Sequence, residues 1–415
     1  MHVTEHFFRH ESGRLIAALT RVFGMDRLTL AEDVTQHAFC RALEVWKVQG
    51  IPENPSAWLL ATAKHQALDV LRKERTARSV APELSRLWDG EADLVRAVDE
   101  AFLAGRIKDE QLRMMFSCCH PRLGEDAQIS LILNILCGFG AGEIAQAFLV
   151  ERAAIEKRIA RGKQILAVSK TLFDLADTEF ESRLSTVRRA LYLLFNEGYH
   201  GAAQPGVIRL ELCEEALRLT SLLGEHGPAA TPTTRALMAL MCLNAARLPA
   251  RVDAAGELVA LYEQDRAQWD PQLIARGLAF FDACANGSEL SAYHVEAAIA
   301  VAHASAASFA ETDWAVVVEL YDRLLSVAPS PVVALNRAIA LGHRDGPARA
   351  LAELQAIADV ERLRSYPFYP AALGEFELRL GHTQAARQHF EAAIRLARND
   401  AERRFLEKRK ACAAH

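Results

Sequence analysis

The sequence predicts an all-α protein, and three observations support this fold class. Apolar residues recur at three- and four-residue spacing through residues 1–80. The same spacing returns over residues 136–166. After Thr171 the chain continues as a succession of amphipathic segments without a persuasive alternating pattern, so no strand is expected there. Breaks rich in proline and glycine separate the segments, which is typical of helices joined by short turns.

Composition limits the classes of protein that this chain can belong to. Its 415 residues predict two to four domains, and a hydrophobic content of 51% is enough for sizeable cores. The net charge of −5 means that any affinity for nucleic acid must come from local basic patches. We find no signal peptide and no membrane-spanning apolar run, so we expect a cytoplasmic protein that does not bind a membrane.

The cysteines do not indicate a metal site. Eight are scattered along the chain, apart from the adjacent Cys118 and Cys119, which precede His120. A second cysteine or histidine pair at zinc-site spacing is missing, so we expect no metal and no other cofactor. The adjacent thiols are then either a buried pair or a redox-sensitive site.

The first two predicted helices cover residues 3–23 and 30–48. Apolar residues recur at helical intervals in the first helix: Phe7, Leu15, Ile16, Leu19 and Val22. The second helix gathers its apolar residues on one side: Ala31, Val34, Ala38, Ala42 and Val45. Its acidic and polar residues lie near its N-terminal end, where carboxylates suit the helix dipole: Glu32, Asp33 and Gln36.

A third helix is predicted over residues 56–75, after Pro52 and Pro55 interrupt the pattern. Its expected buried face contains Leu60, Ala63, Ala67, Val70 and Leu71. The opposite face carries a tryptophan in line with polar and basic residues: Trp58, Thr62, His65, Asp69, Arg72, Lys73 and Thr76. Such a face suits a melted duplex, since aromatic rings contact bases and cations contact phosphates. Alternatively, Trp58 packs on the preceding helix or loop while the bases at the helix end, Arg72, Lys73 and Arg75, are solvated.

Residues 136–166 predict a helix-turn-helix. A short helix over 142–148 turns Ile144 and Ala145 inward, and a second helix begins near Glu151. The second helix buries Ile155, Ile159, Gly162 and Leu166. The opposite face exposes Ala154, Lys157, Arg161 and Gln164, with Arg158 at its edge. Residues 151–170 hold six basic and two acidic side chains. This face can enter a major groove, although an ordinary helical hairpin with a solvated basic face would show the same pattern.

Three segments, in order, resemble regions 2 and 4 of a bacterial RNA polymerase sigma factor. They are AEDVTQHAFCRALEVW (31–46), AWLLATAKHQALDVLRKE (57–74) and the helix-turn-helix at 142–165. The chain is most similar to the extracytoplasmic-function class, in the subgroup with a long helical C-terminal extension, which LYLLFNEGY (191–199) and DRAQWD (265–270) also resemble. The resemblance implies region 2 over 1–80, a linker over 81–108, region 4 over 109–170 and the extension over 171–415.

The resemblance also implies partners and binding residues. The clamp helices of the polymerase β′ subunit would contact Asp33, Gln36, Phe39 and Trp46, and the β flap is a further implied partner. The −10 element would be bound and opened through Trp58, Thr62, His65, Arg72, Lys73 and Arg75. The −35 element would be read by Arg152, Ala154, Lys157, Arg158, Arg161 and Gln164. Two positions depart from the family pattern, since His37 replaces a usual acid and His65 replaces a common asparagine.

The extension predicts further helices, with breaks at 201–206, 224–232, 248–251, 286–288, 329–331, 344–347 and 367–370. Two alanine-rich helices, 348–358 and 383–397, each follow a Leu-Gly-His sequence and resemble tetratricopeptide repeats. Stacked hairpins of this kind leave a groove for a regulatory protein, a peptide or another part of the same chain.

Two groups of residues in the extension could suggest catalysis. We interpret residues 196–200 as a helix C-terminus closed by Gly198. A second group could line a site, or it could supply helix caps and ion-pair partners for Arg251 and Arg266. Its members are Asp253, Glu257, Asp265, Trp269 and Asp270. With no phosphate loop, nucleophile elbow or paired zinc motif, the chain is predicted not to be an enzyme.

The leading prediction is therefore a promoter-specificity subunit of RNA polymerase with a regulatory or activity-supporting extension. The first alternative is a helix-turn-helix regulator whose helical domain binds a ligand or peptide and which acts without sigma activity. The second is a helical scaffold whose basic helices are incidental. Promoter use with core polymerase separates the first reading from the other two.

Overall fold

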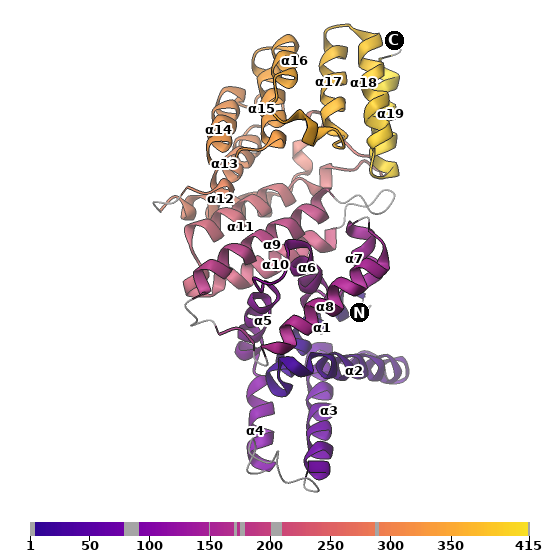
Figure 1. The fold of residues 1–415 in the computed structure, drawn as a ribbon, viewed down its shortest axis with the longest axis vertical. Coiled ribbons are helices and arrows are strands. Elements are labelled where there is room, and N and C mark those ends of the chain that lie inside the picture. The colour runs from indigo at the N-terminus through magenta and orange to yellow at the C-terminus, as the bar shows by residue number, and fades with distance from the viewer. Residues whose placement is uncertain are drawn as a thin grey trace. The chain divides into compact units, whose positions relative to one another are not determined.

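The computed structural model describes residues 5–78, 91–148, 150–169, 172–174, 179–200, 210–286 and 290–413. Throughout these ranges the secondary structure is helical, and an isolated bridge between Val252 and Leu258 is the nearest approach to a strand. This confirms the all-α prediction. None of the helices in the described ranges is long and apolar enough to cross a membrane. The chain divides into two compact units, Met1–Leu193 and Leu194–His415, which can be followed by colour in Figure 1.

The first unit contains eight α-helices and the start of a ninth among its described residues. Their bounds are α1 Glu5–Phe23, α2 Leu28–Gln49, α3 Pro55–Arg78, α4 Glu91–Ala101, α5 Ala104–Cys118, α6 Glu125–Leu131, α7 Ala141–Phe148, α8 Arg152–Val168 and α9 Phe180–His200. A short 3-10 helix, η1 Met25–Arg27, precedes α2, and a π-helical turn, η3 Ile132–Leu136, follows α6. Helix α9 runs across the boundary at Leu193, so the division falls later than the predicted start of the extension at 171.

Local chemistry explains where the first helices begin and end. Gly24 and Gly50 have φ angles of 92° and 82°, which side chains rarely adopt, and they end α1 and α2. Helix α3 begins at Pro55, one residue before the predicted start. The Asn54 side chain accepts a 2.9 Å hydrogen bond from the backbone N–H of Ala57, and proline is favoured in a first helical turn.

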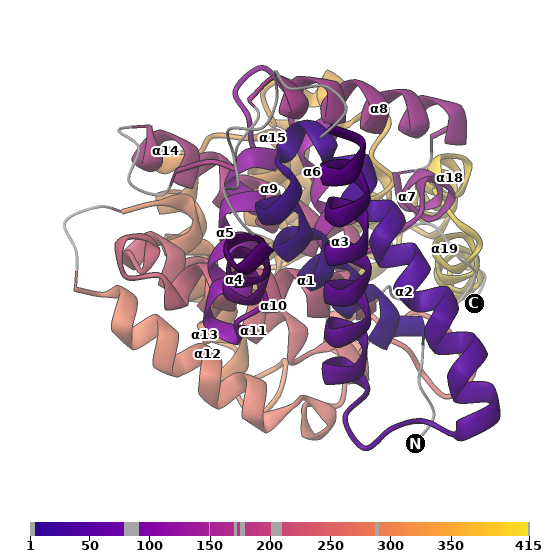
Figure 2. The ribbon, with the colours of Figure 1, turned by 90° about the horizontal axis from the view of Figure 1, so that it is seen from below.

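The core between α1, α2 and α3 follows the predicted apolar stripes with one rotation. The buried alanines of α2 and α3 are those expected: Ala31, Ala38, Ala42, Ala63 and Ala67. On α3, however, Leu59 and Leu68 are buried. Leu60, Val70 and Leu71, which were predicted to be buried, are only partly buried. The shift has a physical reason: Leu68 packs on Val98 of α4, a helix inside the segment predicted as a linker. Figure 2 shows α3 between α4 and α2.

Helix α1 also supplies a wall for the second half of this unit. Its other side packs on α5 and η3. Gly13 lies so close to η3 that a Cβ at this position would be 2.0 Å from the carbonyl oxygen of Leu136. Arg9 forms a 2.5 Å ion pair with Glu143 of α7. The two halves of the unit therefore share α1.

Cys118 and Cys119 are buried at the end of α5. Burial raises the pKa of the Cys118 thiol to about 12 and that of Cys119 well above its usual value. A thiol in this state is poorly reactive, since the thiolate is the nucleophile, so the structure favours the buried pair over the redox-sensitive site. Among the described residues, no group of three or more His, Cys, Asp or Glu side chains could hold a metal ion.

The second unit continues as α-helices that pack on their neighbours in sequence. Their bounds are α10 Leu210–Glu225, α11 Pro232–Ala245, α12 Pro271–Cys284, α13 Ala292–Ala304, α14 Trp314–Val327, α15 Pro331–Arg344, α16 Pro347–Gln355, α17 Phe368–Arg379, α18 Thr383–Leu396 and α19 Asp400–Cys412. The breaks predicted at 224–232, 248–251, 329–331 and 344–347 fall between α-helices, and the one at 367–370 marks the start of α17. The break at 201–206, and residues 287–288 of another, lie outside the described residues.

Short 3-10 helices fill several connections in this unit. They are η4 Gly227–Ala229, η5 Leu248–Ala250, η6 Leu261–Glu263, η7 Arg266–Gln268 and η8 Val360–Leu363. Side chains cap the α-helices that follow some of these turns. Asp270 accepts hydrogen bonds from the backbone N–H groups of Gln272 and Leu273, and Asp313 does the same for Ala315 and Val316.

The prediction that Gly198 closes a helix was wrong. Gly198 is buried inside α9, which continues to His200. A Cβ at Gly198 would lie 2.8 Å from the backbone nitrogen and from Sγ of Cys213 on α10. This glycine therefore permits two helices to approach closely and does not end one.

Of the residues between α11 and α12 that could have formed a site, the acids act as caps and pairs. Asp265 and Asp270 cap η7 and α12, and Glu257 forms a 2.7 Å ion pair with Arg404. The partners predicted for them were wrong. Arg251 lies over the ring of Tyr199 at 4.1 Å, and Arg266 donates to the carbonyl oxygens at the end of α13, those of His303 and Ala306.

Candidate nucleic-acid interface

Helix α8 has the buried face that the sequence predicted. Ile155, Ile159 and Leu166 are buried, as are Ile144 and Ala145 on the preceding α7. Gly162 faces α6, where a Cβ would lie 2.7 Å from the Cδ1 of Leu131. The helix begins after Glu151, whose backbone is extended. With one face fixed against α6 and α7, the opposite face of α8 is directed to solvent.

Most of the residues predicted for −35 recognition lie on this solvent face. Exposed residues are Arg152, Ala154, Lys157, Arg161 and Gln164. Arg152 has a side chain that is 73% exposed and forms a 2.7 Å ion pair with Glu156. In the described part of the chain no ion pair engages Lys157 or Arg161, so both cations are available to an external anion.

Two other bases of α8 are engaged by carboxylates. Arg158 is partly buried and lies 3.6 Å from a carboxylate oxygen of Asp126. Lys163 forms a 2.5 Å ion pair with Glu32 of α2. The basic surface of α8 is therefore smaller than the count of basic residues between 151 and 170 suggests, and its unpaired part is formed by Lys157 and Arg161.

Helix α3 exposes a second set of polar residues. His65, Arg72 and Lys73 are exposed, and Arg72 lies 3.7 Å from Asp69 on the same face. Thr62 is partly buried and its hydroxyl donates a 2.9 Å hydrogen bond to the carbonyl of Trp58. The side chain of Arg75 lies outside the described residues. The exposed polar surface toward the C-terminal part of this helix therefore contains two bases, Arg72 and Lys73, and the Arg72 charge is balanced by Asp69.

The position of Trp58 differs from the prediction that this tryptophan is freely exposed to DNA bases. Its ring is partly buried and meets the ring of Trp46 edge to face, with a centroid distance of 5.4 Å. Trp58 thus packs on the preceding helix, which is the alternative that the sequence left open. The reason is that α2 carries a large aromatic residue within reach of this position.

The residues predicted for polymerase binding separate into two groups. Asp33 and Gln36 are exposed on α2. Phe39 is partly buried, with its ring 5.1 Å from that of Phe8. Trp46 is only 8% exposed, and its ring stacks on that of Phe8 with a centroid distance of 5.9 Å. This burial contradicts the prediction that Trp46 contacts the polymerase directly.

Sequence reasoning missed two exposed apolar side chains on α2. Leu43 is 61% exposed and Val48 is 85% exposed. Helical spacing places both on the face that also carries Asp33 and Gln36. Their position off the apolar stripe was the available signal, because a helix gains no folding energy from apolar residues left in water.

Comparison with known families agrees with this geometry. Residues 7–77 match sigma-70 region 2, which covers α2 and nearly all of α1 and α3. The N-terminal part of the chain therefore carries a sigma-70 region 2, which supports membership of the sigma-70 family; region 2 of that family binds core RNA polymerase and promoter DNA. Residues 183–285 match a family of unknown function, DUF6596.

The resemblance to known proteins extends over nearly the whole chain. An uncharacterised protein of Rhizobium meliloti (strain 1021) is 38% identical over 394 residues, which cover 94% of this chain and 91% of the relative. This chain belongs to the same family as that protein. Because the aligned part covers 94% of this chain, it includes most of the region 2 match and most of the second unit.

Proposed function

We propose that this protein is an extracytoplasmic-function sigma factor that directs RNA polymerase to a specific set of promoters. The observation that carries the proposal is the combination, in one compact unit, of a region 2 match with a second helix pair whose α8 leaves Lys157 and Arg161 unpaired. The region 2 match supports binding to core RNA polymerase. The α8 surface supplies the second contact with DNA.

In this proposal α7 and α8 act as a helix-turn-helix on the −35 element. Lys157 and Arg161 contact phosphates and guanine edges, while Gln164 and the small Ala154 lie close enough to bases to select sequence. Arg152 and Arg158 sit at the sides of this surface and steer the backbone. The exposed part of α3, with His65, Arg72 and Lys73, holds the −10 element.

Polymerase binding is assigned to the exposed face of α2. Asp33 and Gln36 offer polar contacts, and Leu43 and Val48 add apolar area that becomes buried only when a partner covers it. The clamp helices of the β′ subunit are the proposed partner. Trp46 and Trp58 support this face from beneath by fixing α2 against α3.

The second unit is proposed to resemble tetratricopeptide repeats and to support or control promoter use. Its consecutive helices pack pairwise, and α16 and α18 lie close to the two alanine-rich segments that carry the repeat-like sequence. Repeated hairpins present surfaces that recognise other molecules. The protein has no proposed catalytic role.

Run-off transcription with core polymerase tests the central proposal. Transcripts from a cognate promoter should appear only when this protein is added. A helix-turn-helix regulator that acts without sigma activity would instead bind duplex DNA alone and yield no transcript with core polymerase. That second result would reject the proposal in favour of the regulator.

Charge reversal separates DNA reading from polymerase binding. Arg161→Glu should lower promoter-specific transcription at least roughly tenfold, since one phosphate or base contact is worth about 1–3 kcal/mol. The affinity for core polymerase should stay unchanged in a pull-down or by fluorescence anisotropy. Arg122→Glu is the matched control, because Arg122 is exposed in the turn between α5 and α6. Equal losses in both variants would indicate a general charge effect and not a specific surface.

A further inference from the structure

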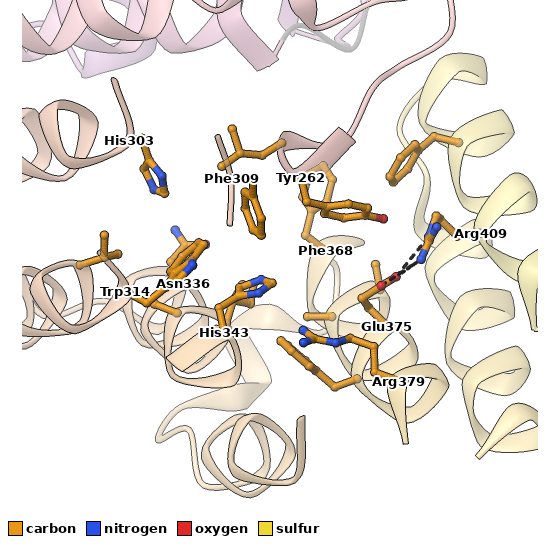
Figure 3. Close-up of a pocket in the computed structure, with 18 of the residues that line it drawn as sticks. Tyr262, His303, Phe309, Trp314, Asn336, His343, Phe368, Glu375, Arg379 and Arg409 are labelled. Carbon is orange, nitrogen blue, oxygen red and sulfur yellow. Dashed lines mark hydrogen bonds and ion pairs between the residues drawn. The ribbon is translucent and has the colours of Figure 1, made fainter. Parts of the chain in front are cut away.

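The second unit contains a cavity that the proposed function does not use. Its volume is about 500 Å³, and α13, α14, α15, α17, α18, α19 and the segment around Tyr262 line it. Figure 3 shows side chains from these elements directed toward a common space. Cavities of this size match small organic ligands, whereas an extended peptide needs a longer groove.

Aromatic side chains form much of the lining. The ring of Trp314 is stacked on that of His343 at a centroid distance of 4.5 Å, and Phe309 meets both edge to face. Tyr262 lies 6.1 Å from Phe309 on the side of α19, where Phe368 also lines the cavity. Flat faces at these positions favour a flat, apolar ligand, because aromatic rings stack with offset or edge contacts.

Two histidines supply neutral polar atoms. His303 is 7% exposed, and its Nδ1 has no hydrogen-bond partner in the described part of the chain. Burial and the charges of Arg247 and Arg266 lower the pKa of His303 to about 3, and burial and the charge of Arg379 lower that of His343 to about 4. A buried polar atom without a partner is costly unless a ligand or water completes it. Figure 3 shows the His303 ring directed toward the cavity.

The charged lining residues leave one cation without a carboxylate. Arg409 holds Glu375 at 2.6 Å and also lies 3.8 Å from Glu263, so this arginine is already neutralised. Arg379 is exposed at the end of α17, with its guanidinium 5.4 Å from the centre of the Phe376 ring. No carboxylate among the described residues forms an ion pair with it. Its charge is close enough to His343 to affect that histidine's pKa.

We propose that this cavity binds a small, planar, largely apolar organic acid. The ring system of the ligand occupies the space beside Phe309, Trp314 and Phe368. Its carboxylate pairs with Arg379 at the edge of the cavity, and a polar ring atom or bridging water completes Nδ1 of His303. This inference stands apart from promoter recognition, because every residue in it belongs to the second unit.

Calorimetric titration of the full chain with two matched probes tests the proposal. The probes are 2-naphthoate and 2-naphthylmethanol, which share a ring system and differ in charge. The acid should bind with one-to-one stoichiometry and at least roughly tenfold more tightly than the alcohol, because a charge-assisted hydrogen bond is added. If neither probe binds, or the alcohol binds as tightly as the acid, the proposal is overturned.

Variants then locate the binding site. Arg379→Gln should remove the preference for the acid while leaving the weaker affinity for the alcohol unchanged. Arg395→Gln is the control, since Arg395 is exposed on α18 and is not among the lining residues. Ala371→Phe places a ring inside the lining and should abolish binding of both probes, with folding verified by circular dichroism and thermal unfolding. Unchanged binding of the acid by a folded Ala371→Phe protein, or loss of preference in Arg395→Gln, would refute the assignment.

Discussion

Each unit of this protein contains a cluster of aromatic side chains, and the two clusters differ in what they surround. In the first unit Phe8, Trp46 and Trp58 pack on one another and on the apolar core of α1, α2 and α3. In the second unit Phe309, Trp314 and His343 make still closer ring contacts but border an open cavity. Similar residues therefore fill an apolar core in the first unit, which we call the filled cluster, and border a cavity in the second unit, which we call the lined cluster.

The difference arises from the neighbouring residues. Around Trp46 the neighbours are mostly apolar and include alanines, so the helices pack closely, and the indole Nε1 of Trp46 is the buried polar atom left without a hydrogen-bond partner in this cluster among the described residues. Around the cavity, His303, Asn336 and the Glu375–Arg409 pair need polar partners and cannot be packed against hydrocarbon without cost. The comparison associates the cavity with several polar groups gathered among aromatic rings, and not with the rings or with one unpaired nitrogen alone.

The largest expected effect is on the filled cluster. Trp46→Ala should destabilise the first unit by about 3–5 kcal/mol, because it removes a large buried ring and leaves a void. Urea unfolding followed by circular dichroism measures the change. Val48→Ala on the same helix is the control and should stay within about 0.5 kcal/mol, since Val48 is exposed. Equal losses in both would mean that the burial of Trp46 contributes little.

Acid should weaken the lined cluster before the filled one. The folded-state pKa values of His303 and His343 are depressed, so their contribution is present above the unfolded value of about 6.5 and is lost as pH falls. Between pH 7 and pH 5 the second unit should lose roughly 2 kcal/mol through the buried His303 and less through His343, which is partly exposed and screened by solvent. In the first unit burial raises the pKa of the Glu11 carboxyl, but its hydrogen bond with His10 and the charge of Arg14 outweigh burial and lower that pKa, so the contribution of Glu11 is lost only below about pH 4.5.

Thermal unfolding across this pH range, monitored separately for tryptophan fluorescence and for total helix content, measures the effect. His343→Phe should flatten the pH dependence between pH 7 and pH 5. Retention of the full dependence in that variant would show that other groups titrate. His389 on α18, which is partly exposed and does not line the cavity, is the control for the loss of an imidazole.

The smallest effect is expected for Trp58→Phe. A phenylalanine keeps an aromatic edge against Trp46 and should cost less than about 1.5 kcal/mol. If Trp58 serves only to position α3, promoter opening measured by permanganate footprinting should be unchanged. A strong decrease in opening by a folded variant would instead show that the ring contacts bases.

Sequence reasoning succeeded where one helix determines its own pattern. The buried residues of α8 and the buried alanines of α2 and α3 follow directly from helical spacing, as do most turns marked by proline or glycine. The faces of Trp46 and Trp58 could not be predicted in this way. Spacing places a side chain around its own helix, but the packing of α2 on α3 decides whether an edge residue is covered.

The cavity could not be predicted because its residues are far apart in sequence. Tyr262, His303, His343 and Arg379 come from different helices or turns, and none belongs to a recognisable motif. His343 lies in the repeated Leu-Gly-His sequence, which predicts a structural repeat but gives no indication that the imidazole of His343 lines a cavity. The prediction for Gly198 was wrong for a related reason. Glycine is favoured both at helix ends and where two helices lie close together, and only the position of α10 distinguishes the two roles.

The contact between Gly13 and the carbonyl of Leu136 has a consequence for how this protein can be divided. A helix that is covered on both sides cannot be released from one side without exposing apolar surface to water. A fragment ending after α3 would lose half of the cover of α1 and should be prone to aggregate. Dissection experiments should therefore cut the chain beyond α8, so that both halves of the first unit stay together.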